Sequence, residues 1–421
     1  MLILSGGSGA RPAKSAALSA ASPSLRVVRL IHTSDWHLGR SFHQVGLLDA
    51  QAAFIDHLVE TVRAESVDAV LVSGDVYDRA LPAPDTVELL SEAVTRLIDT
   101  GAQVVLSSGN HDSAIRLGFA ARLLERSGLH IRSSVGSIGR PVLVDGVAIY
   151  PLPYLEPSIA AEPLGAGERT HAGVLAAAME RVRADRAQRP GPSVVMAHAF
   201  VNGGATSDSE RDITVGGVAM VHPRVFDGSD YVALGHLHGR QQIDETVRYS
   251  GSPVAMSFSE ASHTKGSWVV DLDSSGVRCE QLEAPVLRSL ALLRGDLADL
   301  LERPEHAHAE KAWCQVTLTD AVRPLGAMEQ VRRRFPHTLS LQFDPQGAPV
   351  PVSSYAARVA ARSEVDVCCD FLAHVRAGHG ASEAEREVIA GAVEAARLAR
   401  AGHDDEGAAA GRPDVRREGV A

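Results

Sequence analysis

The sequence predicts an α/β fold in which two β-sheets form a sandwich flanked by helices, followed by a small α/β unit and C-terminal helices. Strand-like apolar segments alternate with helix-like amphipathic segments between Arg26 and Ser113, a pattern typical of a parallel sheet covered by helices. After Gly128 the strand-like segments become shorter and more frequent. This change indicates a second sheet that packs against the first.

The first half of the sandwich is predicted from hydrophobic periodicity. Phe54, Leu58 and Val62 recur at helical spacing. Gly101 ends the next helix-like segment, because glycine readily adopts the conformation that follows a helix. The expected elements are strands near 26–33, 70–73 and 105–108, and helices over 49–64 and 85–100.

The second half is predicted from shorter apolar segments. A polar loop rich in Ser, Asp and Gly occupies residues 202–212. The expected elements around it are strands at 141–144, 147–152, 194–198 and 231–235, a helix over 169–186, and a meander of strands at 247–250, 267–272 and 277–282.

A separate small α/β unit is expected from residue 286 to about residue 350. Its predicted elements are helices over 297–301 and 327–334 and strands at 313–318 and 338–343. Three prolines then mark a linker before two amphipathic helices over 353–376 and 382–400, and Ser382 with Glu385 forms a capping box. We therefore expect domains at 27–285, 286–350 and 351–401, with a disordered tail over 402–421.

Residues 1–26 are rich in Ser, Ala and Gly and contain no Asp or Glu. They lack the continuous apolar region of a secretory signal. We interpret them as a disordered extension, and a translation start near Val27 or Val28 is an alternative hypothesis. Peptide mass mapping of the native N-terminus would exclude that start if it detected peptides from residues 1–26.

Composition and charge limit the class of protein. The 421 residues suffice for one large domain and one or two smaller ones. No apolar run reaches the length of about 18 residues that a membrane span requires. The four cysteines have no CxxC spacing and are interpreted as reduced thiols of a cytoplasmic protein. The net charge of -11 disfavours a nucleic-acid partner, although bound cations would offset part of it.

Five predicted strands end in Asp, Asn or His side chains. Parallel strands present their carboxyl ends at one edge of a sheet, so we expect these side chains to converge. Carboxylate, imidazole and amide groups are ligands of divalent transition metals. The sequence therefore predicts a metal centre whose ligand candidates are Asp35, His37, Asp75, Asn110, His198, His236 and His238.

Seven ligands suit two divalent cations about 3.5–4 Å apart that share a carboxylate. Asp75 is the expected bridge, because it lies at the end of the strand next to the one that carries Asp35 and His37. Asp35, His37 and His238 would complete one site, and the remaining three candidates the other. His111 and Asp112 are the catalytic candidates: His111 would assist departure of a leaving oxygen, while Asp112 and Asp78 would orient His111 and the ligand loops.

These motifs, in the order Asp-x-His, Gly-Asp-x-x-Asp, Gly-Asn-His-Asp, a lone His and Gly-His-x-His, resemble the calcineurin-like metallophosphoesterase family. Within that family, the segments 32–39, 213–217 and 249–253 resemble the SbcD group of nuclease subunits. The resemblance extends from residue 27 to about residue 400. It implies the two-sheet metallophosphoesterase fold with a capping domain at 286–350.

The resemblance also implies a function and partners. It implies a metal-dependent exonuclease and endonuclease that uses two divalent ions, namely Mn2+, on double-stranded DNA ends and hairpins during DNA repair, recombination and replication. It further implies a homodimer within a heterotetramer with the SbcC ATPase, located at the nucleoid in the cytoplasm. The C-terminal helices would bind the SbcC coiled coil. SbcC would also provide the ATP site, since GxxxxGK[ST] is absent from this sequence.

DNA contacts are expected from His43 and from the basic run Arg332, Arg333 and Arg334. A charge run on a helix is equally consistent with a solvated face. Two other functions stay open from the sequence: a small-substrate metallophosphodiesterase with the same site, and a non-catalytic scaffold that tethers SbcC to DNA ends. The complete ligand set argues against the scaffold.

Overall fold

The computed structural model describes residues 26–210, 220–273, 275–345, 363–376 and 380–406. The expected disordered extension therefore lies outside the described residues, apart from Arg26, as does the motif at 213–217. The chain divides into two compact units, residues 1–346 and 347–421. Among the described residues, no helix combines the length and hydropathy that a membrane span requires.

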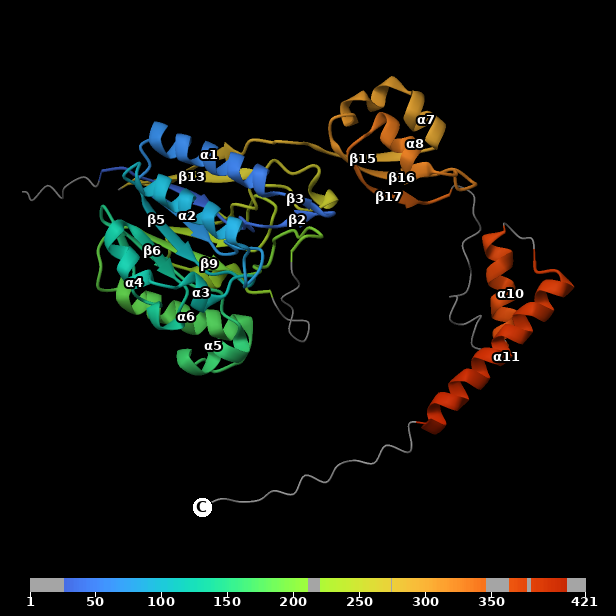
Figure 1. The fold of residues 1–421 in the computed structure, drawn as a ribbon. Coiled ribbons are helices and arrows are strands. Elements are labelled where there is room, and N and C mark those ends of the chain that lie inside the picture. The colour runs from blue at the N-terminus through green and yellow to red at the C-terminus, as the bar shows by residue number, and fades with distance from the viewer. Residues whose placement is uncertain (1–25, 211–219, 274, 346–362, 377–379, 407–421) are drawn as a thin grey trace, which may run out of the picture. The chain divides into compact units, whose positions relative to one another are not determined.

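The first sheet of the larger unit is built mainly from the predicted parallel strands (Figure 1). β1 pairs in parallel with β4, β4 with β5, and β5 with β6, while β13 runs antiparallel to β1. The strand order is β14 (Gly276–Glu283), β13 (Gly266–Asp273), β1 (Val28–Thr33), β4 (Ala69–Ser73), β5 (Gln103–Ser107) and β6 (Leu129–Arg132).

The second sheet contains the two later histidine-bearing strands at its centre. β9 pairs in parallel with both β8 and β10. The strand order is β11 (Gln241–Gln242), β12 (Val247–Tyr249), β10 (Tyr231–Gly235), β9 (Ser193–His198), β8 (Val147–Pro151) and β7 (Val142–Val144).

The two sheets pack face to face around a shared apolar core. Leu30 of β1 and Leu71 of β4 pack in the same cluster as Met196 of β9 and Ala233 of β10. Successive side chains of a strand point to opposite faces, so Ile31 and its counterparts in β4 and β5 face the helices instead. Burial on both faces explains why these strands are continuous apolar runs.

Helices cover both outer faces of the sandwich. α1 and α2 pack on the first sheet, and α5 and α6 pack on the second, so that α1 and α6 lie on opposite sides in Figure 1. Short helices and 3-10 turns connect the strands. The helices are α1 (Leu48–Ala64), α2 (Pro84–Ile98), α3 (Ala114–Leu117), α4 (Ala121–Leu124), α5 (Pro157–Leu164) and α6 (His171–Arg186).

The predicted α/β sandwich is correct, but the expected meander is wrong. β12 joins the second sheet in parallel with β10, whereas β13 and β14 form an antiparallel pair at the edge of the first sheet. Apolar periodicity identifies strands but does not say which sheet they join. β6 and β15, which were not predicted, extend the first sheet and the small unit's sheet.

The small α/β unit has its own parallel sheet and core. β15 (Leu290–Gly295), β16 (Trp313–Leu318) and β17 (Thr338–Phe343) form the sheet, and α7 (Leu297–Glu302) and α8 (Ala327–Arg334) pack on it. The hairpin of β2 (Ser41–Phe42) and β3 (Val45–Gly46) meets this unit, because Phe42 and Phe258 pack in one cluster with Trp313.

The second unit consists of a helical hairpin, α10 (Glu364–Val375) and α11 (Glu383–Glu406). The Ser382 hydroxyl accepts a hydrogen bond from the Glu385 amide, and the Glu385 carboxylate accepts one from the Ser382 amide, which is the predicted capping box. α11 extends to Glu406, beyond the expected helix end at residue 400. Residues 407–421 lie outside the described part.

A close approach between the two sheets sets a steric limit at Gly235. A Cβ atom there would lie 1.9 Å from the Ser73 carbonyl oxygen. We expect Gly235→Ala to lower the free energy of unfolding by roughly 1–3 kcal/mol, because backbone must move apart to admit the methyl group. Urea unfolding of the metal-free protein measures this change. Gly46→Ala is the control, since a Cβ there meets no atom within 4 Å; equal stability of both variants would contradict the expectation.

Candidate metal centre

The candidate ligands lie where the central strands of both sheets end. β1 is followed by Asp35 and His37, β4 by Asp75, and β5 by Asn110 and His111. In the second sheet β9 ends at His198, and β10 leads into His236 and His238. The contact between the two sheets thus brings residues from five strands to one edge.

The backbone at this edge is held in unusual conformations. Asp35, His37, Asp75 and His236 have positive φ angles of 53°, 43°, 48° and 106°. Residues other than glycine rarely adopt such angles, and they do so at functional sites when the surrounding structure enforces them. Gly109 permits the arrangement, since a Cβ there would lie 2.1 Å from Asp75 Oδ1.

The Asp75 carboxylate is at the centre of the cluster. Its Oδ2 lies 3.4 Å from Nε2 of His37, 3.4 Å from Nε2 of His198 and 3.9 Å from Nε2 of His111. Its Oδ1 accepts a hydrogen bond of 2.8 Å from the His111 amide. One carboxylate therefore faces ligand candidates on both sides of the site, as a bridging ligand requires.

Several donor atoms converge closely enough to share a cation. The donor atoms of Asp35, His37 and His238 lie within 4.8 Å of one another, as do those of Asp35, Asp75 and His198. Nε2 of His37 and Nε2 of His238 face each other at 3.1 Å. Two buried carboxylates and three imidazoles at such separations form a donor set that fits divalent cations.

Asn110 and His236 are brought to the same edge. Asn110 Oδ1 lies 2.8 Å from Nε2 of His198, and the His236 ring is 5.3 Å from the His198 ring. The His236 amide donates to both carboxylate oxygens of Asp35. The two residues extend the cluster on the side of His198.

Burial and mutual interactions shift the acid–base properties of the cluster. Burial raises the pKa of Asp35 to about 6. Burial alone would raise the pKa of Asp75, but the His198 imidazolium outweighs it and the pKa falls well below its usual value. Burial alone would lower the pKa of His198, but the Asp75 carboxylate raises it to about 9. Burial and the nearby His198 lower the pKa of His236 to about 3.

His111 has a defined tautomer and direction. Its Nδ1 lies 2.8 Å from the Asp78 carbonyl oxygen, and a carbonyl only accepts, so Nδ1 carries a proton. Nε2 therefore points toward Asp75 and the cluster. Asp78, whose carboxylate accepts a 2.9 Å hydrogen bond from Arg40, orients His111 through its main chain.

The Asp112 side chain binds main-chain amides. Its carboxylate accepts hydrogen bonds from the amides of Val76, Tyr77 and Gly109 at 2.8–3.1 Å. These bonds join the loop that follows β4 to the loop that follows β5. Burial, with the nearby Asp75 charge, raises the pKa of Asp112 to about 6. Its contacts are those of a positioning residue, the orienting role that the sequence suggested for Asp112 beside His111.

The four DNA-contact candidates make different contacts. His43 is exposed on the β2–β3 hairpin, beside Phe42 and Phe258. Arg334 donates to the carbonyls of Leu300 and Arg303, so it stabilises the small unit. The other two arginines differ again: Arg332 donates to the Thr338 carbonyl, and Arg333 pairs with Glu329.

Four polar residues around the site were not predicted. The Gln51 side-chain amide donates to the carbonyls of Trp36 and His37, which holds the loop after β1. Ser209, Glu260 and Lys265 are buried next to His238. In the sequence Ser209 lies in a polar loop and Glu260 follows a short motif. Neither residue stands at a spacing from the ligand candidates that would indicate a contact with His238.

Comparison with known families agrees with this geometry. A model of the calcineurin-like phosphoesterase family matches residues 28–240. This match spans half of the chain, so the protein belongs to the calcineurin-like phosphoesterase family. A second model, SbcD_C, described as the type 5 capsule protein repressor C-terminal domain, matches residues 286–376. Together the two matches define a metallophosphoesterase of the SbcD type.

Two solved structures show distant similarity to this chain. The crystal structure of TT1561 of Thermus thermophilus is 14% identical, covers 61% of this chain and 99% of its own, and has a TM-score of 0.35. A beta-glucosidase from Exiguobacterium marinum is 10% identical, with coverages of 76% and 89% and a TM-score of 0.22. Both TM-scores are below 0.5, so the family assignment rests on the sequence matches.

Metal binding should compete with protons at this site. His198 and Asp35 have raised pKa values of about 9 and 6, and a ligand must lose its proton before it binds a metal. We therefore expect affinity for Mn2+ to rise between pH 6 and pH 9 and protons to be released on binding at neutral pH. Calorimetry in buffers of different ionisation enthalpy measures both. Constant affinity over this range, without proton release, would contradict the expectation.

Proposed function

We propose that this chain is the nuclease subunit of an SbcCD-type complex, which hydrolyses phosphodiester bonds of DNA at double-strand ends and hairpins. The observation that supports this proposal is the buried cluster around Asp75 in a chain whose residues 286–376 match the SbcD C-terminal domain. A nuclease of this kind serves DNA repair, recombination and replication, and acts at the nucleoid in the cytoplasm.

Two divalent ions, with manganese as the expected metal, would be held by the two halves of the cluster. Asp35, His37, Asp75 and His238 would hold one ion. Asp75 would also hold the second, with the ligands Asn110, His198 and His236. When bound, such ions lower the pKa of a water molecule and neutralise charge that develops on the phosphate.

His111 would assist departure of the leaving oxygen. Its Nδ1 donates a hydrogen bond to the Asp78 carbonyl, and this bond fixes the ring with Nε2 toward the cluster. In its protonated form the ring can donate from Nε2 to an oxygen that gains negative charge. The positions of Asp78 and Asp112, which hold the surrounding loops, would limit the movement of this ring.

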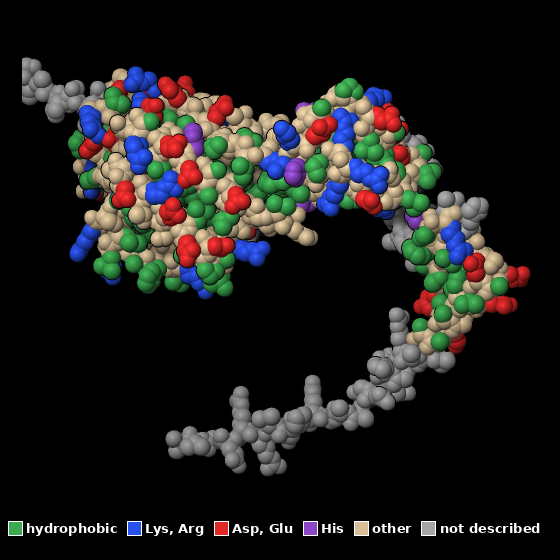
Figure 2. All heavy atoms as spheres, turned by 45° about the horizontal axis from the view of Figure 1, so that its top comes forward, with side chains coloured by type: hydrophobic (Ala, Val, Ile, Leu, Met, Phe, Trp, Pro, Cys, Tyr) green, Lys and Arg blue, Asp and Glu red, His purple; other side chains and the backbone are tan. Residues whose placement is uncertain are grey.

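The regions beyond the sandwich would bind DNA and the partner. We propose residues 286–350 as the DNA-contacting capping domain and 351–401 as the segment that binds the SbcC ATPase, while residues 351–362 lie outside the described part. Phe371, Val375 and Val388 of the helical hairpin are 57%, 63% and 73% exposed. Figure 2 shows such hydrophobic side chains among charged ones on this hairpin, a surface suited to a coiled-coil partner.

A small-substrate phosphodiesterase would use the same cluster. It would need neither the SbcD C-terminal domain nor the exposed apolar face of the hairpin, and these two features favour the nuclease. A non-catalytic tether would need no buried cluster of carboxylates and imidazoles, which carries a desolvation cost unless it is compensated.

A second copy of the chain would bind through the segment that follows the Gly-Asn-His-Asp motif. Ile115, Phe119 and Leu123 are 88%, 81% and 70% exposed. Arg116 donates to the Ala80 carbonyl, which brings the 72% exposed Leu81 close to this segment. Several large apolar side chains exposed on one segment are typical of protein interfaces.

The nuclease proposal predicts the loss of DNA cleavage in two variants. We expect Asp75→Ala and His111→Ala to lower manganese-dependent cleavage by at least about 100-fold, because they remove the shared ligand and the proton donor. The assay uses linear and hairpin double-stranded DNA with and without SbcC and ATP, and a p-nitrophenyl phosphodiester in parallel. Stimulation of the wild type by SbcC and ATP is expected.

His130→Gln is the matched control, because this histidine lies on β6 and bonds Gln103. It should cleave like the wild type, and all variants should retain circular dichroism and SbcC binding. Full cleavage by Asp75→Ala would refute the site assignment. Turnover of the small diester with DNA left intact under every condition would assign the chain to the small-substrate phosphodiesterases.

The dimer proposal predicts a change of mass in solution. We expect Phe119→Glu to convert a dimer into a monomer, because a buried carboxylate without a partner opposes association. Light scattering coupled to size-exclusion chromatography measures the mass. Leu325→Glu is the control, since Leu325 is 92% exposed on the small unit and should not affect association. A wild-type monomer at high concentration would contradict the proposal.

A further inference from the structure

A chain of hydrogen bonds leads from the candidate ligand His238 to a buried ion pair. His238 Nδ1 lies 2.6 Å from the Ser209 hydroxyl. The same hydroxyl lies 2.5 Å from Oε1 of Glu260, and Oε2 of Glu260 pairs with the Lys265 ammonium. All four side chains are buried.

The chemistry of the groups fixes the direction of each bond. A carboxylate paired with an ammonium group only accepts, so the Ser209 hydroxyl donates its single proton to Glu260. The hydroxyl then accepts from His238, whose Nδ1 must carry the ring proton. Nε2 of His238 is left with a free electron pair that faces His37 Nε2 at 3.1 Å, inside the donor cluster.

Lys265 also holds the main chain of the same histidine. Its ammonium donates to the His238 carbonyl oxygen at 2.9 Å and to the Ser252 hydroxyl at 3.0 Å. With the Glu260 bond, these contacts use all three protons of the ammonium group. The backbone and the ring of His238 are therefore fixed by one ion pair.

The surrounding loop fixes His238 from a third direction. Glu210 accepts a hydrogen bond of 2.7 Å from the His238 amide. The Ser209 carbonyl accepts a bond of 3.1 Å from Arg40, whose guanidinium also binds Asp78. The Ser209 loop thus connects His238 with the residue that orients His111.

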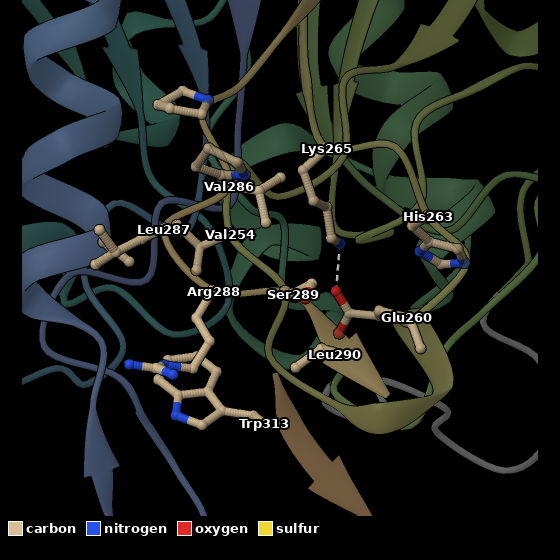
Figure 3. Close-up of a pocket in the computed structure, with 15 residues that line it drawn as sticks. Val254, Glu260, His263, Lys265, Val286, Leu287, Arg288, Ser289, Leu290 and Trp313 are labelled. Carbon is tan, nitrogen blue, oxygen red and sulfur yellow. Dashed lines mark hydrogen bonds and ion pairs between the residues drawn. The ribbon is translucent and has the colours of Figure 1, made fainter. Parts of the chain in front are cut away.

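The ion pair lies at the boundary between the sandwich and the small unit. Glu260 and Lys265 line a pocket of about 190 Å³ together with Val254, Leu287 and Trp313. Figure 3 shows the two charged side chains facing each other, with Trp313 on the opposite side of the pocket. Glu260 is 1% exposed and Lys265 is 6% exposed, and the loss of one partner would leave a buried charge.

We infer that Ser209, Glu260 and Lys265 are positioning residues that hold His238 in the Nδ1-protonated form and aim Nε2 at a metal ion. The inference rests on the proposed function, because it concerns the same metal centre. A purely structural role for the ion pair would not require the bond to the imidazole. Groups that orient a ligating histidine in this way typically contribute about 10–100-fold to metal affinity.

The test measures binding of Mn2+ and Co2+ to the metal-free full-length protein by calorimetry, with the Co2+ absorption spectrum as a second readout. We expect Ser209→Ala and Glu260→Gln to weaken binding of one ion by about 10–100-fold and to alter the Co2+ spectrum. Ser209→Thr retains the hydroxyl and should restore affinity. If Glu260→Gln does not fold, the double variant Glu260→Gln/Lys265→Met takes its place, because it leaves no unpaired ammonium group. It should also bind the metal ion weakly.

Two matched controls separate this role from general stabilisation. Ser193 is a buried serine whose hydroxyl bonds Asp230 at the start of β9, and Asp271 pairs with Arg29 far from the cluster. Ser193→Ala and Asp271→Asn should bind metal like the wild type. If Ser209→Ala had the metal affinity and Co2+ spectrum of the wild type, the inference would be overturned. Intact DNA cleavage in that variant would leave the proposed function standing. Absence of metal binding by the wild type would overturn the proposed function as well.

Discussion

The burial of the Asp75 carboxylate is the constraint on which the site depends. It is 2% exposed and has a positive φ angle of 48°, and both features are unfavourable for an aspartate unless the surroundings compensate for them. The compensation comes from imidazoles of both sheets, from the His111 amide and from the space that Gly109 leaves. A divalent cation adds positive charge beside the buried carboxylates. Metal binding therefore stabilises the fold, and the fold holds the ligands in place for the metal.

Positioning in this site is divided between two kinds of contact. Main-chain groups orient His111 and fix the ligand loops, through the Asp78 carbonyl and through the amides that Asp112 binds. Side chains orient His238, through Ser209 and the Glu260–Lys265 pair. The Asp78 carbonyl is a main-chain group and is present whatever side chain stands at position 78, whereas the Asp112 carboxylate and the groups that orient His238 depend on residue identity. The side-chain contacts are therefore the more sensitive to mutation.

The sequence predicted what depends on local periodicity and failed where tertiary contacts decide. Apolar runs that end in Asp, Asn or His identified the strands and the residues at their ends, because parallel strands share one edge. The placement of β12 and β13 in different sheets has no local sequence pattern. Glu260 and Lys265 meet Ser209 only after the chain has folded. The different contacts of Arg332, Arg333 and Arg334 also depend on the fold, because neighbouring helical residues point in different directions, and their role toward DNA stays a prediction.

The order of the strands along the chain has a consequence for synthesis. The ligand candidates begin at Asp35 and end at His238, and β1, which carries the first of them, pairs with β13 at residues 266–273. A nascent chain emerges from its N-terminus, so the first sheet lacks the neighbour of β1 until β13 has left the ribosome. The last imidazole, at position 238, and the Lys265 ammonium that fixes it are translated only shortly before β13. The candidate site is therefore completed only after most strands of both sheets have been translated.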